Sequence, residues 1–360
     1  MTRARQGYDG VCVAVPASVP YERYSTHGAH WFFGRLLASM LERSGIPKER
    51  VDGLCAASFS LAPDTAIGLT EHLGLTVRWL DHIPLGGASG IVALRRAARA
   101  VQAGDAGIVA CLAADTNEAD SFRKSTAAFS LFGQDAVYPY GSGGPNASFA
   151  FLTDHYMRAY GAEAADFGRI CVAQRRNALD NPHALFRTPL SMDDYLVSRM
   201  IADPVRLYDC VMPCAGAEGF FVMSAGTAAE FGLSTARLLS VVERHNAFPD
   251  DPVQMRGGWA LDARELFAQA GVAHEALDFV QLYDDYPVMV MMQVEDLGFC
   301  GKGEAPGFLR GRDLTTRGSF PLNTSGGQLS VGQAGAAGGF LGIVEAVRQL
   351  TGETVGAAVG

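Results

Sequence analysis

A tyrosine and two aspartates stand together in the segment LYDDYP, residues 282–287, at the end of a strand-like run. Phenol and carboxyl groups can donate and accept protons in a reaction. Because successive side chains of a strand point to opposite faces, Tyr283 and Asp285 would share one face and Asp284 would point away. Two acids at a strand end also form solvated turns, and we expect one of them to cap the helix that begins near Pro287. Tyr283 and Asp285 are therefore a candidate acid–base pair.

A second segment, HIPLGGASG at residues 82–90, reads as a strand end, a glycine turn and the start of an amphipathic helix. Such a turn can hold a nucleophile at a helix N-terminus, where the helix dipole favours an anion. No cysteine lies between Cys55 and Cys111, and the only hydroxyl of the turn is that of Ser89. We expect Gly87 and Ser89 to serve an oxyanion through backbone N–H groups, although glycine here could also serve close helix packing alone.

Alternating strands and helices would position these residues over the first third of the chain. Apolar strand-like runs occur at 11–15, 51–58, 76–83 and 106–115, and helical periodicity at 27–45, 64–74 and in the stretch that ends at Gly104. Continuous apolar strands separated by helices predict a mostly parallel sheet that is covered on both faces.

The alternation breaks at about 116–210, where the chain is aromatic, glycine-bearing and irregular, which is typical of a functional cap. A strand returns at 219–225. The runs that follow predict strands at 236–246 and 278–285 and helices at 260–271, 287–298 and 334–352. Because both parts of the chain share this order of elements, we expect an internal duplication. The predicted halves are residues 1–235, which include the cap, and residues 236–360.

The overall composition narrows the class of protein. With 48% apolar residues, 19% charged residues and a net charge of −9, the chain has the profile of a globular protein without a nucleic-acid surface. Its seven cysteines are scattered, and the C-x3-C pair at 210 and 214 lacks a second ligand pair, so we expect reduced thiols and no metal site. The first ten residues lack a signal-peptide core, and no apolar run is long enough to span a membrane. We therefore expect a cytoplasmic protein.

Four segments in this order, GGASG, DCVMPCAGAEGFFV, LYDDYP and NTSGGQLSVGQAGAAGG, resemble the thiolase superfamily along nearly the whole chain. The resemblance is strongest to sterol-carrier-protein-type thiolases and to the lipid-transfer-protein-type aldolases related to them. It implies an α/β thiolase fold, with two similar βαβαβαββ halves in five layers (α-β-α-β-α) and an inserted cap. It also implies that Asn323, Gly326 and Gly327, in the most specific of the four segments, bind substrate or an oxyanion.

The resemblance also shows where this chain departs from a thiolase. The family's nucleophilic cysteine position is Gly87, and its histidine before the last helix is Gln333, which we expect to contact the pocket. Its third motif places Tyr283 at the oxyanion-hole residue and Asp285 at the acid–base cysteine. Without a thiolate no acyl-enzyme forms, so thiolysis is not expected. The aldolase branch has tyrosines at the third motif and at the histidine position. Tyr283 matches the first of these, and Asp285 could take the role that Gln333 leaves open.

These departures favour a carbon–carbon lyase that cleaves a bulky 3-hydroxyacyl-CoA, with a steroid-like or aromatic side chain, by a non-covalent retro-aldol reaction. The resemblance further implies a homodimer and a small partner protein with an OB-fold and a zinc ribbon, which together would form a heterotetramer. No cofactor is expected, because acyl-CoA enters as the substrate. Two alternatives stay open: a degenerate, thiolase-like structural subunit that binds acyl-CoA, and an enzyme that forms carbon–carbon bonds without an acyl-enzyme.

Overall fold

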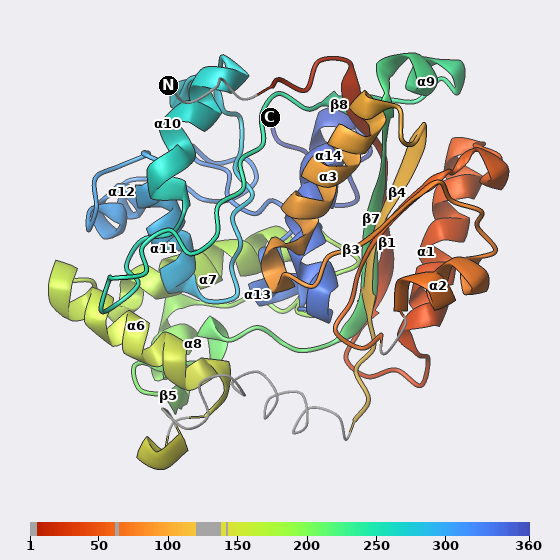
Figure 1. Ribbon diagram of the computed structural model, residues 1–360. Coiled ribbons are helices and arrows are strands. Elements are labelled where there is room, and N and C mark those ends of the chain that lie inside the picture. Colours follow the sequence, from red (N-terminus) through yellow and green to blue (C-terminus); the bar gives the residue numbers. More distant parts are fainter. Residues whose placement is uncertain (1–5, 62–64, 120–137, 142) are drawn as a thin grey trace.

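A six-stranded sheet organises the N-terminal half of the computed structural model, which describes residues 6–61, 65–119, 138–141 and 143–360. Its strands are β1 (Val11–Glu22), β2 (Gly53–Ala57), β3 (Trp79–His82), β4 (Ile108–Asp115), β7 (Ala215–Ser224) and β8 (Thr235–Arg237). The strand order is β3-β2-β4-β7-β1-β8, as Figure 1 shows at the right of the molecule. Strand β3 is therefore one edge of the sheet.

The sheet is mixed, and the expectation of a mostly parallel sheet was wrong. Strand β2 runs parallel to β3 and β4, whereas β7 is antiparallel to both β4 and β1, and β8 is antiparallel to β1. The reason is that β7 returns from the cap in the reverse direction and inserts between β1 and β4, which helical crossovers alone would have kept parallel.

Helices cover both faces of this sheet. On one face lie α1 (Ala29–Ser44) and α2 (Thr65–Leu73), which share an apolar core with Cys12 and Ala14. On the other lie α3 (Ser89–Ala103) and α14 (Gly338–Thr351), which share a core with Val11 and Val13. This alternation along β1 is the two-residue period of a strand that is buried on both faces.

Helices α3 and α14 touch backbone to backbone at their N-termini (Figure 1). A Cβ on Gly90 would lie 2.1 Å from the Gly339 carbonyl oxygen, and a Cβ on Gly339 would lie 2.4 Å from the Gly87 carbonyl oxygen. Only glycine permits this approach. The two glycine turns that the sequence singled out are consequently side by side.

The remaining elements form a mainly helical part with its own apolar core. They are α6 (Gly144–Tyr160), α7 (Ala164–Ala178), α8 (Met192–Val197), α10 (Trp259–Ala270), α11 (Pro287–Asp296), α12 (Ala305–Arg310) and α13 (Gly327–Val331), with a small hairpin of β5 (Met200–Ala202) and β6 (Val205–Arg206). The short helix α9 (Ala225–Glu230) instead follows β7 and packs on the six-stranded sheet. Residues 120–137 and 142 of the expected cap lie outside the described residues.

Two expected strands of the C-terminal half are absent from the described structure. Strand β8 ends at Arg237, so residues 238–246 are irregular, and residues 278–285 form only one parallel bridge, between Val280 and Leu322. The apolar runs are still buried in part, but side chains such as that of Asn323 take the backbone hydrogen bonds that a neighbouring strand would have supplied. In the described part of the chain, no helix has the length and apolarity needed to cross a bilayer.

Candidate active site

The phenol ring of Tyr283 lies directly over Gly87. A Cβ built on Gly87 would lie 2.1 Å from Cζ of Tyr283 and 2.5 Å from its hydroxyl oxygen. Gly87 belongs to the short turn η2 (Gly86–Ala88), which leads into α3. The Ser89 N–H at the start of α3 donates to the Gly86 carbonyl, and the Ala88 N–H before it donates to the Leu85 carbonyl at 3.2 Å. The phenol nevertheless stands beside the positive end of the helix dipole. The space that a side chain at position 87 would need is thus filled by the aromatic ring.

Gln333 contacts the same phenol. Its Nε2 donates to the Tyr283 hydroxyl at 3.3 Å and to Oε1 of Gln328 at 3.3 Å. Its backbone is fixed on the chain that leaves the cap, because its N–H donates to the Met212 carbonyl at 2.9 Å and its carbonyl accepts from the Cys214 N–H at 3.0 Å. Since the amide of Gln333 donates to the phenol oxygen, the phenol proton is left for a substrate atom.

The backbone of Tyr283 is held by Gln293, which the sequence analysis missed. Gln293 donates from Nε2 to the Tyr283 carbonyl at 2.7 Å, and its Oε1 accepts from the Tyr283 N–H at 3.1 Å. It is buried in α11. A signal was present, because Gln293 is the one uncharged polar residue in the helix PVMVMMQVED, where a buried amide needs partners.

Asp284 does not cap α11, as was expected of one of the two aspartates. Its carboxylate accepts from the Gln328 N–H at 2.9 Å and the Leu329 N–H at 3.2 Å, at the start of α13. The N-cap residue of α11 is Tyr286, and its side chain makes no capping hydrogen bond. A Cβ on Gly327 would lie 2.1 Å from Oδ2 of Asp284, so glycine is needed there. Asp284 is therefore a structural clamp on α13.

Asp285 is the carboxylate that remains for chemistry. Its Oδ1 accepts from the Tyr286 N–H at 3.1 Å, and no basic residue of the described chain forms an ion pair with it. Burial, together with the charge of Asp284, raises the pKa of Asp285 to about 7. Burial also raises the pKa of Asp284 to about 6, against the lowering effect of its N–H partners. Burial, and then the charge of Asp285, raise the pKa of Tyr283 well above its ordinary value.

The side chains of Ser89 and Asn323 form hydrogen bonds with the backbone of other residues. The fully buried Ser89 hydroxyl donates to the Ile83 carbonyl at 2.9 Å and accepts from the Leu85 N–H at 3.2 Å. Asn323 accepts from the Leu282 N–H at 2.7 Å and donates to the Leu282 carbonyl at 3.0 Å. These side chains fix the elbow and the strand-like run before Tyr283, so the geometry gives them positioning roles.

The nearby glycines serve packing. A Cβ on Gly326 would lie 2.6 Å from Cβ of Ala178, which brings α7 against this turn.

Asp115 was also missed in the sequence. It ends β4 and accepts from the Ala336 N–H at 2.7 Å, just after Gln333. It also accepts from the hydroxyl groups of Ser58 and Ser60, which ties the turn after Gln333 to the N-terminal sheet.

The candidate site combines the Tyr283 phenol with the Asp285 carboxyl group, and no described cysteine offers a thiolate beside them. The cysteine next to Gln333 is Cys214, which is 2% exposed, and burial raises the pKa of its thiol well above the ordinary value, so it stays protonated and a poor nucleophile. Within the described residues, no three His, Cys, Asp or Glu side chains gather as a metal site would require. The arrangement suits proton transfer beside a helix terminus that can stabilise an oxyanion.

Known proteins with similar sequence support a common reaction. A family model described as thiolase C-terminal domain-like matches residues 242–359. A 17-hydroxy-3-oxo-4-pregnene-20-carboxyl-CoA lyase of Mycobacterium tuberculosis is 32% identical to this chain over 339 residues, which cover 89% of this chain and 86% of the relative. A steroid side-chain-cleaving aldolase of Thermomonospora curvata is 30% identical over 329 residues, with coverages of 87% and 83%.

A solved aldolase structure also resembles this chain in fold. The Ltp2-ChsH2(DUF35) aldolase matches the fold with a TM-score of 0.81 and 27% sequence identity, and the match covers 96% of this chain and 91% of that one.

Proposed function

Because this chain belongs to the thiolase superfamily and is an aldolase of its sterol-carrier-protein-type branch, we propose that it cleaves a bulky 3-hydroxyacyl-CoA with a steroid-like or aromatic side chain. The expected fold class is confirmed by the match to a solved aldolase over nearly the whole chain. The observation that carries the proposal is the Tyr283 ring over Gly87, where a thiolase would need its nucleophile.

The proposed reaction needs one base and one acid. The carboxylate of Asp285 takes the proton of the substrate 3-hydroxyl group, and the electron pair of that O–H bond becomes the carbonyl π bond. The C2–C3 bond breaks, and its electrons form the enolate of the shortened acyl-CoA. The N-terminus of α3 stabilises the enolate oxygen, and the Tyr283 phenol delivers its proton to C2. Proton transfer from Asp285 to Tyr283 then restores both groups.

The pKa values support this division of roles. A carboxylate whose pKa lies at about 7 is a far better base near neutral pH than an ordinary one. The Tyr283 phenol keeps its proton at neutral pH because burial raises its pKa, so it suits the acid. The Gln333 amide donates a hydrogen bond to the phenol oxygen, so the phenol proton points away from Gln333.

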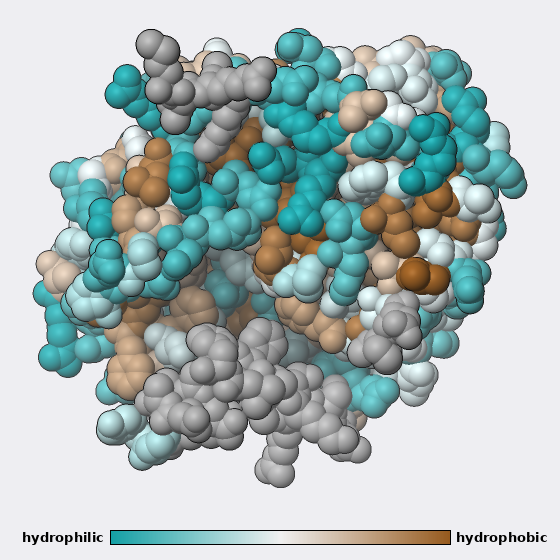
Figure 2. All heavy atoms as spheres, in the orientation of Figure 1, coloured by the Kyte–Doolittle hydropathy of each residue, from teal (hydrophilic) through white to brown (hydrophobic). Residues whose placement is uncertain are grey.

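A homodimer and a partner protein belong to this proposal. Strand β3 is an unpaired sheet edge, and it could pair with the same strand of a second copy. Leu80 on β3 is 36% exposed, and Figure 2 shows apolar residues at the right of the molecule, in the region of α2, which packs beside β3. The name of the solved aldolase pairs two proteins, which supports a partner protein here. We propose that this partner is a small protein with an OB-fold and a zinc ribbon.

The test is the identity of the products. The purified chain, with and without its partner, is incubated with 3-hydroxyacyl-CoA candidates that carry steroid or aryl side chains. We expect equal amounts of an aldehyde or ketone and an acyl-CoA shortened at C3, and loss of both in an Asp285→Asn variant. Carbon–carbon cleavage that requires added free CoA, or binding without any product, would contradict the proposal.

A further inference from the structure

A cavity of about 680 Å³ lies against α7, on the side of this helix that faces away from the candidate active site. The helix lines the cavity with Arg169, Val172 and Arg176, whereas Gln174 and Ala178 face the turn that contains Gly326 and Gly327. With 3.6 residues per turn, these two sets lie on opposite faces of the helix. The full thickness of α7 therefore separates the cavity from Asp284 and Tyr283.

Four arginines line the cavity, and three of them form no ion pair with a described residue. Arg310 is paired with Asp166 through two hydrogen bonds of 2.6 Å, and Arg312 donates to the Phe308 carbonyl at 2.8 Å. Arg169 and Arg176 have no ion pair within the described part of the chain, and Nε of Arg169 is buried without a hydrogen-bond partner.

A single acid among the lining residues offsets little of this charge. It is Asp313, whose Oδ1 accepts from the Thr315 N–H at 2.9 Å. A buried donor without a partner costs free energy unless a ligand or water satisfies it. The cavity is thus positively charged and holds an unsatisfied donor.

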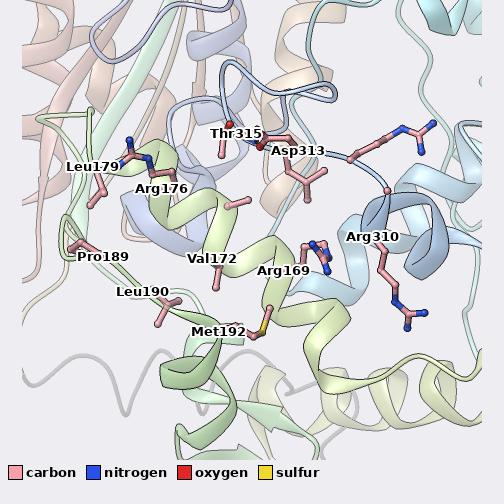
Figure 3. A pocket seen from close by; sticks show the side chains of 14 residues that line it. Arg169, Val172, Arg176, Leu179, Pro189, Leu190, Met192, Arg310, Asp313 and Thr315 are labelled. Atoms are coloured by element: carbon pink, nitrogen blue, oxygen red, sulfur yellow. Dashed lines mark hydrogen bonds between the residues drawn. The ribbon is translucent and has the colours of Figure 1, made fainter.

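The centre of the cavity is apolar. Figure 3 shows Arg176 towards one end and Arg169 and Arg310 towards the other, with Val172, Leu190 and Met192 between them. Guanidinium groups bind phosphate and carboxylate oxygens in pairs of hydrogen bonds, and an apolar wall binds hydrocarbon. A ligand that matches both surfaces is an organic anion with an apolar body.

We propose that this cavity is a second ligand site, distinct from the acyl-CoA site, which binds an organic phosphate or carboxylate with an apolar body. The anionic group would pair with Arg169, whose Nε lacks a partner, the apolar body would lie along the centre of the cavity, and the charge of Arg176 at the other end would add to the attraction. The ligand would rest on α7, whose opposite face contacts the active-site turn. This proposal does not rest on the proposed lyase activity, because the binding it describes can be measured without turnover.

The test is calorimetric titration of the full chain with octyl phosphate, with octanoate and with CoA. We expect one site for at least one octyl ligand, and binding at least about tenfold weaker in an Arg169→Gln/Arg176→Gln double variant, because the double variant removes a charged hydrogen-bond donor and a second positive charge. The octyl ligands distinguish phosphate from carboxylate. The matched control, Arg264→Gln, removes an exposed arginine of α10 outside the cavity and should bind like the wild type.

Two further variants keep the result interpretable. Arg176→Gln alone changes an exposed side chain, so it should fold normally and still weaken binding by about threefold or more. Tyr283→Phe should bind the octyl ligand unchanged. Equal binding by the wild type and the double variant, or no binding by the wild type, would overturn the proposal. So would a tenfold loss of CoA affinity in the double variant, because the cavity would then be part of the acyl-CoA site.

Discussion

The Tyr283 ring fills the space that a side chain at position 87 would need. The ring needs a residue without a side chain at position 87, and a side chain at that position would displace the ring. The phenol therefore occupies the position beside the helix terminus where a thiolase needs its nucleophile. In the proposed mechanism, a proton donor thus stands where a covalent intermediate would otherwise form.

The Gly87→Ala variant tests this dependence. The added methyl group would lie 2.1 Å from Cζ of Tyr283, so we expect a loss of about 1–3 kcal/mol in the free energy of unfolding. In a Tyr283→Ala background the same change should cost well under 1 kcal/mol. Urea unfolding of the four proteins measures the coupling, and additive effects would show that the ring does not fill this space.

The raised pKa of Asp285 predicts the pH dependence of the reaction. The base must be deprotonated, so kcat/KM should rise with pH through about 7 and then level off. Asp285→Asn should abolish this acidic limb together with most of the activity, whereas Asp81→Asn, on strand β3, should retain both. A profile that is flat between pH 5 and 8 would exclude Asp285 as the base.

The same pKa has a consequence for stability with the opposite sign. The folded protein holds the Asp285 proton up to about pH 7, whereas the unfolded chain releases it near its ordinary pKa of about 3.9. Between these values the folded state binds more protons, so the free energy of unfolding should fall as pH rises. Asp285→Asn should flatten this decline in urea unfolding between pH 4 and 7.5, and an unchanged slope would contradict the assignment.

The structure brings Tyr283 into contact with both Gly87 and Gln333, and each of the three lies in a motif of the resembled family. The expectation that Asp284 or Asp285 caps α11 was wrong, since strand alternation and helix proximity say nothing about α13, which lies about forty residues further along the chain. Gln293 went unnoticed because the role of a buried amide depends on the backbone group it meets.

Among the secondary-structure elements, the run at 278–285 is held by a side chain, that of Asn323, in place of a neighbouring strand. It has a φ of 48°, and its side chain makes both hydrogen bonds that a neighbouring strand would make to Leu282. This explains why residues 278–285 looked like a strand in sequence yet form no ladder. Helices were predicted well because glycines end them, as Gly104 does after α3 with a φ of 79°. Apolar runs mark buried segments, but they do not reveal what satisfies the backbone.

Two substitutions of Asn323 should separate its two contributions. Asn323→Gly removes both hydrogen bonds and should lower the free energy of unfolding by about 2 kcal/mol. Asn323→Ala also places an ordinary side chain in the left-handed region, which costs about 1 kcal/mol more. Chemical denaturation measures both, and equal stability of Asn323→Ala and the wild type would exclude this role.

At the scale of the whole molecule, the proposed dimer predicts the effect of a charge on the sheet edge. Leu80, which is 36% exposed on β3, would lie in the interface, so Leu80→Lys should convert a dimer into a monomer. Leu261→Lys, at a residue 50% exposed on α10, is the matched control and should leave the dimer intact. Sedimentation velocity distinguishes the species, and a wild-type monomer at micromolar concentration would refute the dimer.

In the proposed mechanism, Tyr283 supplies the proton to C2, and the reaction has no covalent intermediate. Tyr283→Phe keeps the ring over Gly87 and removes only the hydroxyl group, so substrate binding and folding should be preserved. With a 3-hydroxyacyl-CoA substrate, the variant should lose about 100-fold or more in kcat, with KM changed by less than about threefold. A variant that cleaves the substrate at the wild-type rate would contradict the mechanism.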